Sequence, residues 1–468
     1  MTDSEPQEPG RAGRAFHHAA PRPSARPAPS LVLCGARLAD GRTVDVRLVG
    51  ERIEAVGTAG SLGRAHESGT RLDLTGYLLL PAPAEPHAHY DTALTAEPPR
   101  PCHPGGGPGA PQDPSGTARI AAGPAGSGTD GDPAAPYRAR GGADPTCEDI
   151  QRRTTEAALL QLGQGATAVR THVRIGDVAG LRSLEAVLQA RRALSGMVDL
   201  STVAVPRLLT GVAGAEGLAM LRDAVKMGAA AVGGCPDLDP DPGGYVEAVL
   251  DVAAEHGCPV DLHTDGGDPA RLARLAAAAG GLRPRVTIGP CGGLARLPHQ
   301  VAQRAAGQLA AAGVTVVSLP QGDCGVLERP TPTAPYRMAP VRMLMAAGVK
   351  VTAGSGALRD AANEVGRGDP LEAAYLLASR GEARPGGAYE AISARARSAM
   401  GLPRVRVEAG FPAELLAVRG TQLAGALSLA YSRIVVHRGR VVARTSAVRE
   451  YCDLAGAREL GLPRQSQG

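Results

Sequence analysis

The hydrophobic pattern of the chain changes between its two ends and its middle. At both ends, apolar and polar residues alternate in short runs such as TVDVRLVG and RIVVHRG, which are separated by Gly and Asp. This alternation is typical of half-buried β-strands. We therefore predict a composite β-sandwich domain built from residues 30–80 and 405–446.

The middle of the chain, residues 81–404, repeats an apolar run followed by a stretch with helical spacing. In chain order the eight runs are GYLLLPAPAEPHAH, GATAVRTHV, VDLSTVAVP, AAAVGGCP, CPVDLHTD, RVTIGPC, VTVVSLP and VKVTAGS. Eight successive β/α units predict an α/β fold with a (β/α)8 TIM-like barrel. A doubly wound open sheet has the same periodicity, but no glycine-rich phosphate motif follows the first run.

Three segments lack either period. They are a leader at 1–29, a Gly/Pro-rich insertion into the barrel at about 101–146, and a C-terminal tail at 447–468. The leader and the insertion contain few aliphatic residues, so folding could not offset the entropy of ordering them. We expect the leader to be disordered. The insertion either closes over the barrel mouth as a lid or hangs from it, and the sequence leaves both open.

Composition excludes several classes of partner. The formal charge is +4, the Arg residues are dispersed, and aromatic residues make up 2% of the chain with no Trp. We therefore expect no nucleic-acid partner and no membrane partner, since no run approaches the roughly 18 to 20 apolar residues of a spanning helix. The eight Cys form no Cys-x-x-Cys pair, and the leader lacks the apolar region of a secretory signal. A cytoplasmic protein with reduced thiols is expected.

Histidines follow or end several of the predicted barrel strands. His87 and His89 are one residue apart, so both imidazoles point to the same face of the first strand. His172 is placed at the end of the second strand and His263 at the end of the fifth. Because a parallel barrel gathers its chemistry at the C-terminal strand ends, these side chains are expected to meet, and imidazoles suit a metal ion.

The segments LLPAPAEPHAHYDTALT, VRTHV and VDLHTD resemble the cytosine deaminase-like branch of the amidohydrolase superfamily, a family of metal-dependent hydrolases. The resemblance runs from about Leu31 to Ser446 without the insertion. It implies hydrolysis of non-peptide C–N bonds of cyclic amidines by metal-activated water. It further implies one divalent ion, Zn or Fe, held by His87, His89 and His263.

The same resemblance implies a small-molecule ligand of the nitrogen-heterocycle type, contacted by His172 and Arg207, and it is compatible with a homo-oligomer. Arg207 stands where the family has a ring-contacting Gln. Its fixed charge and five donors favour an anionic or carbonyl-rich ligand over neutral cytosine.

Three positions depart from the family pattern. The Glu that carries protons corresponds to Gly266, a His at the end of strand six to Pro290, and a metal-binding Asp after strand eight to Gly356. Neither Gly nor Pro can bind a metal or relay a proton through a side chain. Asp265 and Asp268 are the nearby carboxylates that are candidates to substitute for the missing Glu.

Three hypotheses follow, and whether the protein is an enzyme stays open among them. The first is an amidohydrolase-family protein whose activity is impaired or rewired by a degenerate active site. The second is a non-catalytic barrel that binds a small molecule or a partner subunit. The third is a fully active deaminase in which the late strands align differently and an unidentified carboxylate reaches the metal.

Overall fold

The computed structural model describes residues 30–62, 70–96, 145–176, 180–281, 285–322 and 336–447. The predicted leader, nearly all of the predicted insertion and nearly all of the predicted tail lie outside these residues. Within the described residues, no helix is long and apolar enough to cross a membrane.

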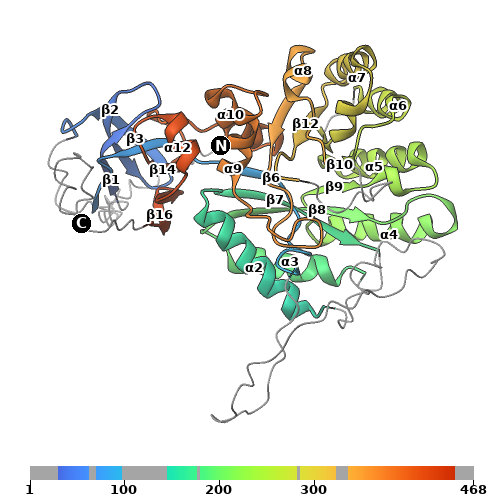
Figure 1. The fold of residues 1–468 in the computed structure, drawn as a ribbon. Helices are drawn as coiled ribbons and strands as arrows, with labels where there is room; N and C mark the ends of the chain where they lie inside the picture. The colour runs from blue at the N-terminus through green and yellow to red at the C-terminus, as the bar shows by residue number, and fades with distance from the viewer. Residues whose placement is uncertain are drawn as a thin grey trace, which may run out of the picture.

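Both chain ends contribute strands to one mixed sheet, drawn in blue and red in Figure 1. Its order is β16-β15-β14-β5-β1-β2-β3, with β4 beside β1, and the antiparallel pairing of β5 with β14 joins the two ends. The strands are β1 (Ser30–Arg37), β2 (Thr43–Val49), β3 (Arg52–Thr58), β4 (Thr70–Asp73), β5 (Tyr77–Pro81), β14 (Leu415–Arg419), β15 (Arg433–His437) and β16 (Arg440–Thr445). The predicted composite β domain is thereby confirmed.

The second sheet contains eight parallel strands in sequence order, from β6 to β13. A bridge between Ala88 and Gly356 brings the last strand back to the first and nearly closes the barrel. The strands are β6 (Ala84–Ala88), β7 (Ala168–Ile175), β8 (Asp199–Pro206), β9 (Ala231–Gly234), β10 (Val260–Thr264), β11 (Val286–Pro290), β12 (Thr315–Ser318) and β13 (Lys350–Ala353). All eight predicted barrel strands are present, which confirms the barrel and excludes the open sheet.

Helices cover the outside of the barrel (Figure 1). They are α2 (Cys147–Gly163), α3 (Arg182–Ala193), α4 (Gly211–Met227), α5 (Pro242–His256), α6 (Pro269–Ala279), α7 (His299–Ala311), α8 (Val341–Ala346), α9 (Pro370–Ser379), α10 (Pro385–Ile392) and α11 (Ala394–Ala399), with 3-10 turns η1 (Pro236–Leu238) and η2 (Gly292–Arg296). Helix α12 (Leu423–Leu429) connects β14 to β15 and packs against α9 and α10. Asp241, Asp268 and Asp369 cap the N-termini of α5, α6 and α9. Each carboxylate accepts backbone N–H bonds that the first helical turn leaves free.

The two faces of each barrel strand have different neighbours. Outward-facing residues such as Val173, Leu262 and Val316 belong to the large apolar core shared with the helices. Residues of the opposite parity, including Arg170 and His172 on β7, face the barrel interior, because successive side chains of a strand alternate. The alternation therefore directs the histidines and the polar residues two positions before them into the barrel.

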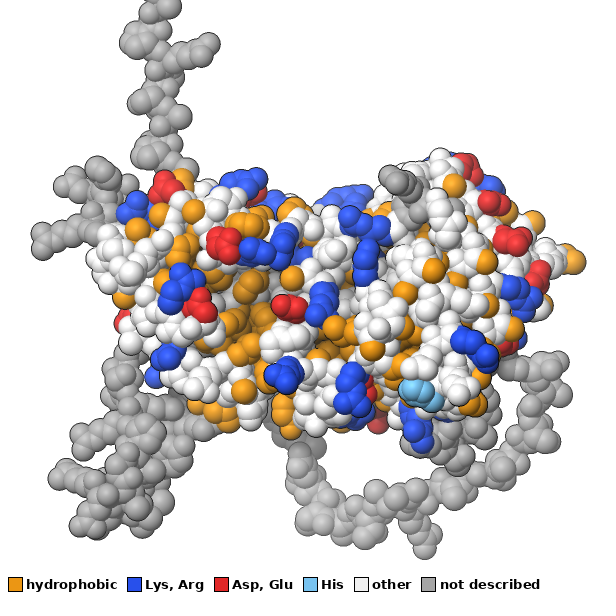
Figure 2. Space-filling model, turned by 90° about the horizontal axis from the view of Figure 1, so that it is seen from above, with side chains coloured by type: hydrophobic (Ala, Val, Ile, Leu, Met, Phe, Trp, Pro, Cys, Tyr) orange, Lys and Arg blue, Asp and Glu red, His pale blue; other side chains and the backbone are white. Residues whose placement is uncertain are grey.

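A buried ion pair joins the sheet domain to the barrel. Arg433 on β15 donates from Nη1 and Nη2 to the two carboxylate oxygens of Asp369 at 2.8 and 2.6 Å. Over the face shown in Figure 2, Lys and Arg side chains are scattered among Asp and Glu. On this face the charged side chains are therefore dispersed, as the sequence predicts for the Arg residues.

Candidate metal centre

The four predicted histidines meet at one end of the barrel. His87 lies in β6, His89 directly follows it, His172 lies in β7 and His263 in β10. One ring nitrogen of each lies within 4.8 Å of the corresponding nitrogens of the others. Nε2 of His89 is 3.3 Å from Nε2 of His87 and 3.1 Å from Nε2 of His263. His172 lies within β7 rather than at its end, since the strand continues to Ile175.

All four rings are buried, His89 being 3% exposed and the others 0%. Burial lowers the pKa of His87, His89 and His172 well below the ordinary value, and the neighbouring imidazoles lower it further. These three rings are therefore held neutral, which is the form that binds a metal. Converging neutral nitrogens fit a divalent ion such as zinc or iron, which accept imidazole ligands.

Glu85 supports the backbone of the first ligand strand. Its Oε1 accepts the backbone N–H of His87 at 3.0 Å, while Oε2 accepts the backbone N–H of Ser355 at 2.9 Å and its hydroxyl. Burial raises the pKa of Glu85 to about 7, against the opposing effect of these hydrogen bonds. The carboxyl group ties β6 to the segment after β13, where the barrel closes.

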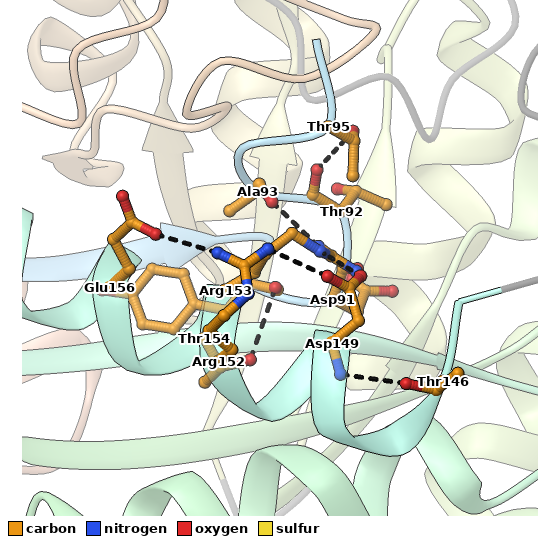
Figure 3. Close-up of polar contacts among 11 residues, drawn as sticks. Asp91, Thr92, Ala93, Thr95, Thr146, Asp149, Arg152, Arg153, Thr154 and Glu156 are labelled. Atoms are coloured by element: carbon orange, nitrogen blue, oxygen red, sulfur yellow. Dashed lines mark hydrogen bonds and ion pairs between the residues drawn. The ribbon is translucent and has the colours of Figure 1, made fainter. Parts of the chain in front are cut away.

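Helix α2 holds the loop that follows His89, as Figure 3 shows. The guanidinium of Arg153 donates from Nη1 to the backbone carbonyls of Asp91 at 3.0 Å and Ala93 at 2.8 Å. Its Nε donates to Asp149, one turn earlier on the helix, at 2.8 Å. Arg153 is 3% exposed, so this buried cation fixes the course of the loop from outside the barrel.

A second carboxylate lies inside the barrel, next to the cluster. Oδ2 of Asp261 is 3.0 Å from Nη1 of Arg170, and its Oδ1 is 3.5 Å from Nε2 of His172. All three side chains are buried. Sequence reasoning missed Arg170 and Asp261, although a signal existed: each stands two residues before a histidine on a strand, in Arg-x-His and Asp-x-His, and so shares its face.

Other interactions engage the two carboxylates expected to replace the missing Glu. Asp265 is ion-paired with Arg296. Asp268 caps α6, accepting the backbone N–H groups of Ala270 at 2.9 Å and Arg271 at 3.1 Å. Neither belongs to the four-histidine group. A proton-carrying role for either stays a prediction that these contacts do not favour.

Apolar groups surround the positions where the family pattern has polar side chains. Gly266 has a φ of +69°, and a Cβ there would lie 3.4 to 3.5 Å from Leu294, Cys291 and Leu272. Gly356 has a φ of +74°, and its Cβ would lie 3.3 Å from Cδ1 of Leu319. Both backbones adopt the left-handed region that glycine tolerates. Gly266 and Gly356 thus have no functional side chain, and the backbone conformation at both positions favours glycine over any other residue.

The remaining expected residues lie at or near the strand ends. Pro290 is buried as the last residue of β11. The neighbouring Cys291 is also buried, and burial raises the pKa of its thiol, which disfavours a thiolate ligand. Arg207 directly follows β8 and is exposed, outside the four-histidine group. Its contact with a substrate stays a prediction.

The chain belongs to the amidohydrolase family, because the model of that family matches residues 116–443. A pterin deaminase from Rhizobium rhizogenes is 27% identical over 316 residues, covering 65% of this chain and 72% of that protein. N-isopropylammelide isopropyl amidohydrolase from a Pseudomonas species is 25% identical over 319 residues, covering 65% and 75%.

Solved structures agree with this assignment. N-isopropylammelide isopropylaminohydrolase from Burkholderia multivorans superposes with a TM-score of 0.72 at 26% identity, covering 90% of this chain and all of that one. 5-Methylcytosine deaminase from Klebsiella pneumoniae superposes with a TM-score of 0.71 at 21% identity, covering 91% and 100%. The second likeness shows the fold alone. Together with the sequence relatives, the findings support the deaminase-like branch that the sequence motifs indicated.

Proposed function

We propose that this protein binds one divalent metal ion through His87, His89 and His263 and hydrolyses a non-peptide C–N bond in a small nitrogen heterocycle. The observation that supports this proposal is the convergence of three Nε2 atoms. That of His89 lies 3.1 Å from that of His263 and 3.3 Å from that of His87. Family membership supports the reaction class, since the relatives are named as a deaminase and an amidohydrolase.

The residues of this chain hold and orient the ion. Burial keeps the imidazoles of His87 and His89 neutral. Glu85 fixes the strand that carries His87, and Arg153 fixes the loop after His89. A divalent ion held there supplies Lewis acidity toward water and toward a polar group of the substrate.

Proton transfer is the step for which the site is poorly equipped. Among the described residues, the cluster contains imidazoles only, and Gly266 brings no carboxylate. A positioned general acid–base typically contributes about 10²- to 10⁴-fold to a rate. We therefore expect metal-dependent turnover that is slow compared with an enzyme that keeps the carboxylate.

The names of the relatives suggest the ligand class. A pterin and N-isopropylammelide are both nitrogen heterocycles. The permanent charge of Arg207, if it contacts the ligand, favours an anionic or carbonyl-rich member of this class. Substrates that carry such groups are the first to test.

A non-catalytic barrel is the second candidate, and one observation favours it. Leu294 and Leu272 line the space beside Gly266, and Leu319 lines the space beside Gly356. Both positions therefore have apolar surroundings in place of a group that could bind metal or carry a proton. A protein with this arrangement would retain ligand binding through the barrel mouth without turnover.

Metal analysis combined with product release separates the two functions. The wild-type protein is compared with a His87→Ala, His263→Ala double variant and with His299→Ala, an exposed histidine of α7. The hydrolase predicts near-stoichiometric zinc or iron, and release of ammonia or an amine from pterin, N-alkylammelide or cytosine substrates. Both should be lost in the double variant alone. Bound metal with no release from any of these substrates would favour the non-catalytic barrel.

A further inference from the structure

We infer that His172 is a fourth ligand of the metal ion, occupying the role that Gly356 leaves without a side chain. This inference rests on the proposed binding of metal by His87, His89 and His263. The sequence assigned His172 to the substrate, whereas its position in the barrel points to the ion.

The placement of the ring is the first argument. The centroid of His172 lies 4.2 Å from that of His87, 4.6 Å from that of His263 and 5.2 Å from that of His89. One of its ring nitrogens belongs to the set in which all donor atoms lie within 4.8 Å of one another. The register of β6 against β7, which pairs Ala88 with Thr171, brings the ring to this depth.

The unsatisfied state of the ring is the second argument. His172 is fully buried, and neither of its ring nitrogens makes a hydrogen bond of good geometry within the described part of the chain, although the backbone of Ala88 and the carboxylate of Asp261 lie nearby. Leaving a buried polar group without a partner costs roughly 1 to 3 kcal/mol. Coordination would satisfy one nitrogen at the place where three other donors already converge.

The carboxylate behind the ring is the third argument. Oδ1 of Asp261 lies 3.5 Å from Nε2 of His172, and Arg170 holds the other oxygen at 3.0 Å. A ligand histidine usually has a carboxylate or carbonyl beside its second nitrogen, which orients the ring and raises its basicity. Asp261 places a carboxylate oxygen beside Nε2 of His172, without hydrogen-bond geometry, and itself remains outside the donor set.

The consequence is a change in the character of the site. An imidazole in place of a carboxylate gives four neutral nitrogen donors, so the ligands cancel none of the 2+ charge of the ion. Imidazole donors suit zinc, iron, nickel or copper better than magnesium or calcium. The uncompensated charge also favours an anionic ligand, in agreement with the argument from Arg207.

Titration of the metal-free protein tests the assignment without measuring turnover. Zinc affinity is measured in competition with a chelator, and the visible absorption of bound Co²⁺ reports the number and type of its ligands. We expect His172→Ala to weaken zinc binding by about 100-fold or more, since loss of an outer-shell partner alone costs about 10- to 100-fold. Its Co²⁺ spectrum should also change. His87→Ala should abolish binding, and His299→Ala should change neither quantity.

The possible failures are distinguishable. If His172→Ala keeps wild-type zinc affinity and Co²⁺ spectrum while His87→Ala loses metal, the inference about His172 is overturned and the proposed metal site stands. If the wild-type protein binds neither ion, the proposed function itself fails. Should His172→Ala unfold, as judged by circular dichroism, His172→Asn decides the question, because an amide in place of imidazole must still alter the Co²⁺ spectrum of a true ligand position.

Discussion

The two sides of the barrel mouth differ in what their strands contribute. Strands β6, β7 and β10 bring four imidazoles together, whereas β11, β12 and β13 lead into Pro290, Leu319 and Gly356. Both sides nevertheless share continuous parallel pairing. The comparison shows that the strand ends of one barrel can differ in chemistry from side to side while the strand pairing is continuous.

The side that keeps the histidines also has charged groups in the barrel interior. Arg170 on β7 reaches Asp261 on β10, although 91 residues separate them in the sequence. On the opposite side, Val317 and Leu319 form a small apolar cluster. A buried ion pair thus lies beneath the imidazoles, whereas β11 adds only the hydroxyl of Thr287 to it. The following experiments probe this difference.

The largest effect is expected for Arg170→Met. This variant leaves Asp261 as an uncompensated buried charge, which should lower the free energy of unfolding by about 3 to 5 kcal/mol. Urea denaturation measures the change. The matched control is Arg222→Met, which removes the exposed pair with Glu255 and should cost at most about 1 kcal/mol. Equal losses in the two variants would contradict the structural role of the buried pair.

A smaller effect is expected for Gly356→Ala on the apolar side. The left-handed backbone alone costs a non-glycine residue about 1 to 2 kcal/mol. Gly381 has the same φ of +74° with no atom within 4 Å of an added Cβ, so Gly381→Ala isolates that term. Thermal and urea unfolding should show a larger loss for Gly356→Ala, because its Cβ meets Leu319. Equal losses would mean that a ligand side chain could be restored there without repacking.

Arg153→Met should act on the metal rather than mainly on the fold. Loss of its bonds to the carbonyls of Asp91 and Ala93 frees the loop after His89, so zinc affinity should fall roughly 10-fold, as for other outer-shell changes. The neighbouring Arg152, exposed on the same helix, provides the control as Arg152→Met. Chelator competition measures both, and an unchanged affinity in Arg153→Met would show that the loop holds its course without α2.

The smallest effect concerns pH and lies away from the metal. Burial raises the pKa of Glu414. His437, the backbone N–H of Arg438 and the charge of Arg397 together outweigh burial, so the net pKa is below the ordinary 4.5. A carboxylate with a depressed folded pKa stabilises the protein above its unfolded pKa and loses that contribution as pH falls through the folded value.

Urea unfolding between pH 3 and pH 7 tests this expectation. Wild-type stability should decline with acid more steeply than that of Glu414→Gln, because the amide cannot take up the proton. Exposed Glu408→Gln is the control for removal of a surface carboxylate. Parallel pH profiles for wild type and Glu414→Gln would refute the assignment.

Much of the fold and part of the candidate site could be predicted from the local pattern of residues in the sequence. The eight apolar runs, the alternating ends and the placement of His87 and His263 depend on periods of two and 3.6 residues, and those periods are properties of neighbouring residues. The sequence also shows that Gly266, Pro290 and Gly356 have no side chain that could bind a metal or carry a proton.

The sequence by itself therefore determined the barrel, the composite sheet, the family and the residues available for metal binding. Tertiary structure alone decided how closely the ring of His172 approaches the other three, that Arg170 pairs with Asp261, and that Asp268 is used as a helix cap. Strand register and barrel closure set these relations between segments far apart in the chain. A shift of one residue in that register would turn His172, Arg170 and Asp261 to the other face of their strands.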